Sequence, residues 1–204
     1  MSRRRERGFT LIELVLALSI LAVMLAVLFG SLRVGLRAWQ RGEERAETLQ
    51  HARSMTQILE QALGGAYAFQ GVVDQNSQPQ IIFKGAADRL SFVTVSPPMP
   101  FPVPIAFTSV TLLMEAGTSP GLAIREKALP NFQPFEEVAP SLVDPSITAI
   151  RFRYLRDEGS WEEAWDAGEE RGLPRAVEVT LTAMINGRVR EQSPMTVPIR
   201  VTTP

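Results

Sequence analysis

A long run of apolar positions dominates the N-terminal end of the chain. Between Phe9 and Phe29 there are 21 residues and one charged side chain, Glu13. As a helix with about 1.5 Å of rise per residue, this run is roughly 30 Å long, which is the thickness of the hydrocarbon core of a bilayer. The pattern predicts a membrane-spanning helix.

Beyond this run, apolar residues recur at spacings of three and four, which places them on one face of a continuing helix. They are Leu28, Leu32, Leu36 and Trp39 and, after a polar patch, Leu49, Ala52, Met55, Leu59, Ala62 and Leu63. No proline precedes Pro79, and Gly64-Gly65 supplies a C-terminal stop. The sequence predicts one helix from Phe9 to Leu63.

Three glycines, Gly30, Gly35 and Gly42, lie inside this helix. Each costs up to about 1 kcal/mol relative to alanine in a helix interior. We therefore expect the helix to bend or unwind around them.

After Gly65 the pattern changes to short β-branched and aromatic runs separated by turn residues, and all 15 prolines lie between Pro79 and Pro204. The first runs predict strands at 66–73, 80–83, 90–96, 107–115 and 122–127. The proline-rich segment 96–104 cannot donate a regular ladder of hydrogen bonds, so we expect an extended connector there. Docking of this segment to a partner in polyproline form is the alternative.

Apolar and polar residues alternate more clearly near the C-terminus, at 150–154 and 177–182, as in strands with one solvated face. Asn186-Gly187 predicts a type I′ hairpin into 188–191. A last strand is expected at 196–201, and Pro198 favours a sheet edge for it. The fold class is therefore α+β: a long N-terminal helix packed on an antiparallel β-sheet domain.

The charge pattern indicates how the chain is oriented. Arg3, Arg4, Arg5 and Arg7 precede the apolar run, and no comparable cluster follows it closely. By the positive-inside rule, residues 1–8 stay in the cytoplasm and the remainder crosses outward. Without these residues, 17 of the 21 basic and 21 of the 22 acidic side chains remain, which leaves no basic surface for nucleic acid.

A secretory signal peptide would carry a small-residue cleavage site after the apolar run, and none of the A-x-A kind follows Phe29 closely. Instead, a glycine, Gly8, stands directly before the run, and the run opens with Phe9-Thr10-Leu11-Ile12-Glu13. This arrangement resembles the processing site of the type IV prepilin and type II secretion pseudopilin superfamily. The resemblance implies cleavage by a prepilin peptidase between Gly8 and Phe9, methylation of the new Phe9 amine, and retention of the apolar helix as a filament stem.

Glu13 is expected to act in assembly. An ionised carboxylate in lipid costs about 2.5–3.5 kcal/mol and normally faces a partner. The available cation is a terminal amine, its own or that of Phe9 in a neighbouring subunit, and the family's assembly scheme implies the neighbour. The alternative is a charge tolerated at the membrane edge.

The C-terminal region carries a second resemblance. An aromatic strand, a Gly159 turn, Trp161 and Trp165, and then Leu173-Pro174-Arg175-Ala176-Val177 are similar to the C-terminal pattern of the minor pseudopilin J family of type II secretion. The segment from about 72 to 145 shows no resemblance. The J family resemblance implies a place at the pseudopilus tip beside the I and K pseudopilins, with the H and major G types as further contacts, and a role in exporting folded proteins.

These features predict four regions. Residues 1–8 form a cleaved leader, 9–29 a transmembrane stem, 30–64 its periplasmic continuation and 65–204 a periplasmic β-rich domain in a protein of the bacterial inner membrane. A minor pilin of a type IV pilus or competence system is the first alternative, and a membrane-anchored periplasmic binding domain is the second.

Catalysis has little support in the sequence. The phosphate-cradling, dinucleotide, metalloprotease and nucleophile-elbow motifs are absent, and without cysteine there is neither a disulfide nor a thiolate metal site. We therefore expect no enzyme, no cofactor, no metal and no small-molecule substrate. His51, four residues after Glu47, is interpreted as a solvated or ion-paired helix residue.

An acidic segment lies between the two best strands. Its acidic residues are Asp157, Glu158, Glu162, Glu163, Asp166, Glu169 and Glu170. Calcium would need several such oxygens, but the EF-hand order is absent, so a solvated loop is the preferred interpretation. Trp161 and Trp165 are expected to anchor the core or this loop.

Overall fold

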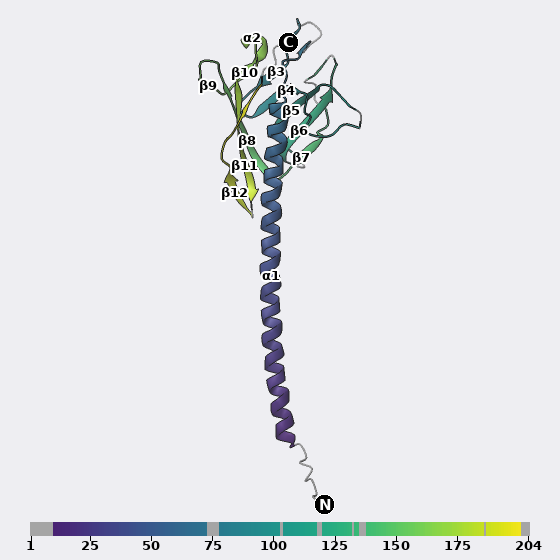
Figure 1. Cartoon of the computed structure of the whole chain (residues 1–204), viewed down its shortest axis with the longest axis vertical. Helices are drawn as coiled ribbons and strands as arrows, with labels where there is room; N and C mark the ends of the chain where they lie inside the picture. The colour runs from purple at the N-terminus through teal and green to yellow at the C-terminus, as the bar shows by residue number, and fades with distance from the viewer. Residues whose placement is uncertain are drawn as a thin grey trace, which may run out of the picture. The chain divides into compact units, whose positions relative to one another are not determined.

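The computed structural model describes residues 10–72, 78–102, 104–117, 120–131, 133–134, 138–185 and 187–200, and for residues 40–49 the backbone alone. The chain divides into two compact units, Met1–Glu47 and Thr48–Pro204. Helix α1, Leu11–Gly64, contributes to both units (Figure 1). It ends at the glycine pair that the sequence marked as a stop.

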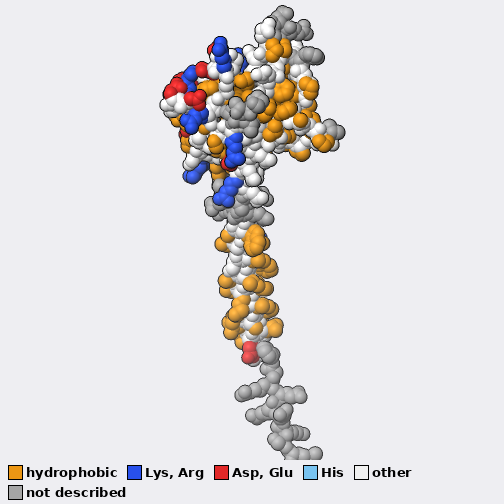
Figure 2. Space-filling view, turned by 45° about the horizontal axis from the view of Figure 1, so that its top comes forward, with side chains coloured by type: hydrophobic (Ala, Val, Ile, Leu, Met, Phe, Trp, Pro, Cys, Tyr) orange, Lys and Arg blue, Asp and Glu red, His pale blue; other side chains and the backbone are white. Residues whose placement is uncertain are grey.

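In the first unit, α1 is a stem without any covering layer. Every side chain described from Leu11 to Trp39 is exposed, and this 29-residue stretch is long and apolar enough to cross a membrane. Figure 2 shows hydrophobic side chains around the visible face of the stem.

The expected unwinding at the glycines is wrong, because the helix is continuous through Gly30, Gly35 and Gly42. A Cβ added at Gly30 or Gly35 would meet no atom within 4 Å. Gly30 and Gly35 lie within the stretch from Leu11 to Trp39, where opening the helix in a bilayer would leave backbone groups without hydrogen bonds, at a cost of several kcal/mol each. This penalty exceeds the roughly 1 kcal/mol of glycine's poor helix propensity. Gly42 lies beyond this stretch, so the penalty does not apply to it.

The described part of the second unit contains two large antiparallel sheets. The six-stranded sheet has the order β10-β3-β4-β5-β6-β7 and the five-stranded sheet the order β12-β11-β8-β9, with β13 also paired to β11. The strands of the first sheet are β10 (Trp165–Asp166), β3 (Phe83–Gly85), β4 (Arg89–Thr94), β5 (Thr108–Glu115), β6 (Gly121–Ala128) and β7 (Leu142–Asp144). Those of the second are β12 (Arg188–Glu191), β11 (Ala176–Ile185), β8 (Ile147–Leu155), β9 (Trp161–Glu162) and β13 (Met195–Pro198).

Two small elements complete the second unit. Strands β1 (Gln70–Gly71) and β2 (Gln80–Ile81) form a separate ribbon. Helix α2 (Ala167–Glu170) is a single turn whose N-cap is Asp166, which accepts a hydrogen bond from the Gly168 amide.

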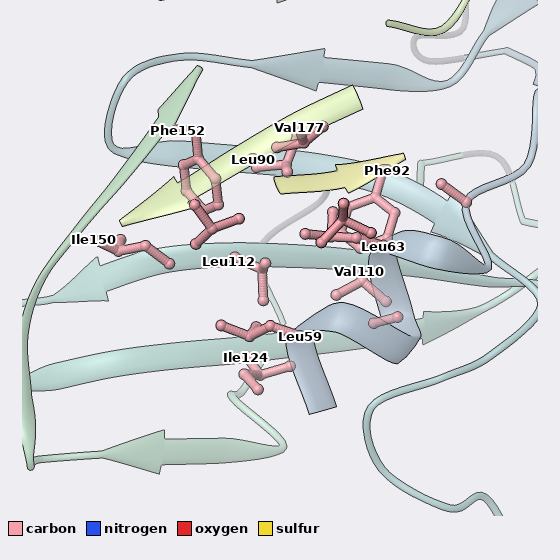
Figure 3. Close-up of a cluster of buried hydrophobic side chains, with 14 of the residues drawn as sticks. Leu59, Leu63, Leu90, Phe92, Val110, Leu112, Ile124, Ile150, Phe152 and Val177 are labelled. Carbon is pink, nitrogen blue, oxygen red and sulfur yellow. The ribbon is translucent and has the colours of Figure 1, made fainter. Parts of the chain in front are cut away.

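The last turns of α1, from Met55 onward, pack against both sheets. Figure 3 shows Leu59 and Leu63 beside side chains from each. The buried cluster also includes Leu90, Phe92, Val110, Leu112 and Ile124 of the first sheet and Ile150, Phe152 and Val177 of the second. Of the apolar helix face predicted from Leu28 to Leu63, the part from Met55 onward is confirmed as part of this core. Leu28, Leu32, Leu36 and Trp39 are exposed, so that part of the prediction is wrong within the chain itself, and the Leu49 side chain is not described.

Most predicted strands are confirmed within one to three residues, but three kinds of error occur. The strand predicted at 80–83 is divided between β2 and β3, which belong to different sheets. The strand predicted at 66–73 reduces to a bridge between Ala66 and Thr94 and the two residues of β1, with 73 outside the described residues. Strands β7, β9 and β10 and helix α2 were missed. Elements of two to four residues are too short to show a period, so the sequence could not distinguish them from loops.

The predicted hairpin and edge strand are also confirmed, whereas the type I′ geometry stays a prediction because Asn186 is not described. Ile185 pairs with Arg188 across a two-residue turn in which Gly187 has φ 71°, while Asn186 and the end of the strand predicted at 196–201 lie outside the described residues. Strand β13 pairs with β11 alone among the described strands, so Pro198 lies at an edge.

The described residues between β4 and β5 belong to no strand, as expected for the proline-rich connector. Its Met99 amide donates to Glu126 Oε1 at 3.1 Å. Burial raises the pKa of the Glu126 carboxyl, although this hydrogen bond and one involving Ser141 act in the opposite direction.

In the wild type, Glu126 is expected to make the free energy of unfolding fall as pH rises from weakly acidic to neutral, and Glu126→Gln is expected to make this fall smaller. A carboxyl whose pKa is raised by folding stabilises the folded state below its unfolded pKa, and this contribution disappears as pH rises through the folded pKa. Glutamine keeps an acceptor for Met99 and does not titrate. Urea unfolding at several pH values measures the effect, and an unchanged pH dependence would contradict it.

Candidate functional site

The N-terminus of α1 is capped by Thr10. Its carbonyl accepts hydrogen bonds from the amides of Glu13 and Leu14 at 3.1 and 3.2 Å. Its hydroxyl Oγ1 lies 3.4 Å from the Glu13 amide and donates to Glu13 Oε2 at 3.3 Å. Threonine followed three residues later by glutamate is the capping-box pattern, so this role of Thr10 was readable from the sequence but was missed.

Glu13 lies in the first turn of the exposed stem. Within the described residues, Thr10 is the one hydrogen-bond partner of its carboxylate. A carboxylate has about four acceptor positions, so most of this capacity is unused. Gly8 and Phe9, the predicted cleavage and methylation residues, lie outside the described residues.

In the second unit, His51 pairs with an acid far away in the sequence. Its Nε2 lies 2.8 Å from Asp144 Oδ2, and the Asp144 side chain is 2% exposed. The carboxylate also accepts hydrogen bonds from the Ser146 amide and hydroxyl at 2.9 and 2.7 Å. The sequence suggested an ion-paired histidine with Glu47 as neighbour, but the Glu47 side chain is not described and the partner found is Asp144.

Serine, histidine and aspartate are therefore adjacent here, but their order does not fit nucleophilic catalysis. In a catalytic triad the histidine lies between the serine and the acid and takes the serine proton. Here Asp144 lies between the other two, and each of them bonds to it. The arrangement fastens α1 to the end of β7 instead.

The acidic segment is organised around Arg156. Its guanidinium makes two bonds to Glu170, at 2.8 and 2.5 Å, and lies 3.3 Å from a Glu162 oxygen and 4.0 Å from a Glu158 oxygen. It also lies 5.5 Å from the centroid of the Trp165 ring. The hydrogen bond to Glu170 raises the pKa of Arg156 further above its ordinary value. The interpretation as a simply solvated loop needs this correction, because several of the acids are paired.

Two further contacts hold this segment in place. Trp165 is 8% exposed and donates from Nε1 to the Gly172 carbonyl at 2.9 Å. Lys84 on β3 lies 3.3 Å from Asp166. No group of three or more histidine or acidic side chains among the described residues is placed to hold a metal ion. Trp165 is thus a loop anchor, as expected, and Trp161 is half-buried beneath Arg153.

Two known family models match successive parts of the chain. Residues 3–29 match the prokaryotic N-terminal methylation motif. Residues 30–194 match the family described as type II secretion system (T2SS), protein J. The chain belongs to the protein J family. The match includes the segment from 72 to 145 in which the sequence alone showed no resemblance.

A curated relative agrees with this assignment. The type II secretion system protein J of Xanthomonas campestris pv. campestris is 35% identical over 95 residues. The aligned region covers 47% of this chain and 45% of the relative, so the match spans about half the length of each. The pilus and competence alternatives are not favoured by either comparison.

Membership of the J family and the N-terminal methylation motif together identify a pseudopilin-like component of a secretion system. The apolar stem supports membrane anchoring, with a soluble C-terminal domain. The family is a structural part of the secretion machinery and is not known for an enzymatic activity.

Proposed function

We propose that this chain is a minor pseudopilin of the type II secretion system. It is inserted into the inner membrane with its N-terminus in the cytoplasm and its β-rich domain in the periplasm. A prepilin peptidase removes residues 1–8, and Phe9 becomes the methylated N-terminus. The mature chain then enters the tip of a short periplasmic pseudopilus, where it primes assembly and supports the export of folded proteins.

One observation carries the proposal: the methylation motif and the protein J match follow each other directly on one chain, at 3–29 and 30–194. The junction falls within a single helix whose first part is apolar and exposed. Such a stem can exchange lipid for neighbouring stems with little change in apolar burial, because lipid tails are as apolar as leucine. Packing and polar pairing then decide the register, which is the role proposed for Glu13.

The partners follow from the same proposal. The prepilin peptidase acts on Gly8-Phe9, and the I and K pseudopilins are the expected tip partners, with the H and major G types below them. No catalytic step is proposed, since the Ser146, Asp144 and His51 arrangement lacks the order that a nucleophile requires.

Intact mass measurement tests processing. The protein extracted from membranes is expected to lack Met1 to Gly8 and to carry one added methyl group. The same chain from cells without the peptidase serves as the control and is expected to retain all 204 residues. An uncut chain in the presence of active peptidase would favour the membrane-anchored binding domain instead.

Co-purification then tests the assignment to secretion. The full chain in detergent, mixed with tagged I and K pseudopilins, is expected to form a stoichiometric complex. Tagged minor pilins of a type IV pilus are the matched comparison. Preferential capture by the pilus proteins would overturn the secretion assignment but leave the processing result intact.

A further inference from the structure

The hairpin of β11 and β12 presents exposed arginines at the end of the second sheet. Arg188 and Arg190 pair in register with Ile185 and Ala183, whose side chains pack with the core. All four residues of β12 are exposed. Neither arginine side chain has a hydrogen bond or ion pair with any described residue.

Arg53 of α1 extends this basic surface. It lines a hollow of about 630 Å³ whose other wall includes Ile185 and Gln192 from the hairpin and the segment after it. Arg53 is exposed and, like the hairpin arginines, has no ion-pair partner in the described part of the chain. Glu60 also lines the hollow, and Arg188 and Arg190 are not among its lining residues. We call Arg53, Arg188 and Arg190 the arginine surface.

The opposite face of the hairpin is apolar. Met184 and Val189 are paired in register and are 40% and 60% exposed. They are among the few large hydrophobic side chains exposed in the second unit. These apolar side chains therefore lie on the face of the hairpin away from Arg188 and Arg190.

The arginines of this surface differ from those at the other end of the same sheet. Arg156 there is fully engaged by acidic neighbours and a tryptophan ring. Figure 2 shows acidic and basic side chains intermixed in one region of the unit and basic ones with few acids elsewhere. The three arginines of this surface, which have no ion pair within the described residues, are therefore available to an anionic partner, whereas Arg156 is not.

A bilayer is the one partner that the chain itself brings close. Arg53 follows Trp39, the last residue of the membrane-spanning stretch, by 14 residues. This length of chain extends at most about 50 Å, so the bilayer has a high effective concentration at the arginine surface. An anionic headgroup contributes about 1 kcal/mol for each nearby arginine.

We propose that the arginine surface docks on anionic phospholipid headgroups of the membrane in which the chain is anchored, before assembly. Docking would hold the β-rich unit at the bilayer until partners release it. The inference concerns the membrane-bound subunit and does not depend on the identity of its filament partners.

Fluorescence quenching in vesicles tests the docking. The chain contains no cysteine, so Val189→Cys in the full chain gives one labelling position on the exposed hairpin. The labelled protein is placed in vesicles of phosphatidylcholine alone or mixed equally with phosphatidylglycerol, each with a quencher on the lipid headgroup. We expect strong quenching in the anionic vesicles and weak quenching in the neutral ones.

Replacing Arg53, Arg188 and Arg190 together with glutamine is expected to shift the docking equilibrium by roughly 100-fold, or about fivefold per arginine, toward the undocked state. Raised salt should act in the same direction. Arg171→Gln removes the same charge from an exposed position after α2 and should change nothing. A label at Glu163→Cys, in the acidic segment, should remain unquenched.

Two results would overturn the proposal. One is equal quenching in neutral and anionic vesicles. The other is quenching that survives the triple substitution while capture of another pseudopilin is lost, which would assign the arginines to a protein interface. Thermal unfolding of the triple variant establishes that its second unit is intact, as expected for three exposed positions.

Discussion

Glu13→Ala is expected to leave membrane insertion and peptidase cleavage intact and to reduce incorporation into the pseudopilus tip by about 100-fold or more. The apolar helix remains, so insertion is preserved. The change removes the carboxylate proposed to pair with the Phe9 amine of a neighbouring subunit. Breaking one side of a buried ion pair costs about 3–5 kcal/mol, because the other charge is left without compensation.

Crosslinking of the mature variant to its tip partners measures this loss, with intact mass verifying cleavage in the same sample. Glu13→Asp keeps the charge on a shorter side chain and should retain part of the assembly. Thr10→Ala removes the hydroxyl that bonds to Glu13 but leaves the carboxylate. Normal recruitment of Glu13→Ala would remove the proposed role of this residue.

Thr10→Ala also separates two functions of the first helical turn. Loss of an N-cap hydroxyl typically costs about 1 kcal/mol of helix stability. If the Thr10 contact only caps the helix, its loss should weaken assembly far less than the loss of Glu13. Equal defects in the two variants would show that capping, rather than the carboxylate charge, controls assembly.

The features that were predictable from the sequence either repeat a hydrophobic period over many residues or contain a short motif of characteristic residues. The repeated period is that of the helix to Gly64 and of strands β8 and β11. The turn at Gly187 was predictable because it has a positive φ, which glycine adopts readily. The processing site was visible because it is such a short motif. The family comparison extended the protein J resemblance, which rested on the C-terminal region, to residues 30–194.

The features that were not predictable depend on residues that only folding brings together. His51 and Asp144 are 93 positions apart, and no local pattern relates them. Arg156 and Glu170 are 14 positions apart, and no local pattern relates them either. The continuous helix at Gly30 is a different case. The helix-propensity argument holds for a helix in water, but in lipid an opened helix leaves backbone groups without hydrogen bonds, and this cost keeps the helix closed.

The contact between Gly85 and Tyr154 shows how the two sheets are joined. Tyr154 on β8 is fully buried and donates from its hydroxyl to the Ala86 carbonyl at 3.0 Å. Its ring meets Phe83 edge-on at 6.1 Å. Burial raises the pKa of the Tyr154 phenol, with the Asp88 charge acting in the same direction, so the hydroxyl stays a proton donor at neutral pH.

Gly85→Ala is expected to lower the free energy of unfolding of the second unit by about 3 kcal/mol. A Cβ at this position would overlap the hydroxyl and ring of Tyr154. The ring is enclosed by the core, so it can move only by leaving its rotamer and its bond to Ala86. Urea unfolding followed by tryptophan fluorescence measures the change.

A double-mutant cycle distinguishes this overlap from a general glycine effect. Tyr154→Phe alone should cost about 1 kcal/mol, the usual contribution of one hydrogen bond. Tyr154→Leu removes the ring atoms that the new Cβ would meet, so Gly85→Ala should cost much less in that background than in the wild type. If the cost of Gly85→Ala is the same in the Tyr154→Leu background as in the wild type, the new Cβ and the Tyr154 ring do not compete for space. The space at Gly85 would then not be what allows Tyr154 of the second sheet to reach the first.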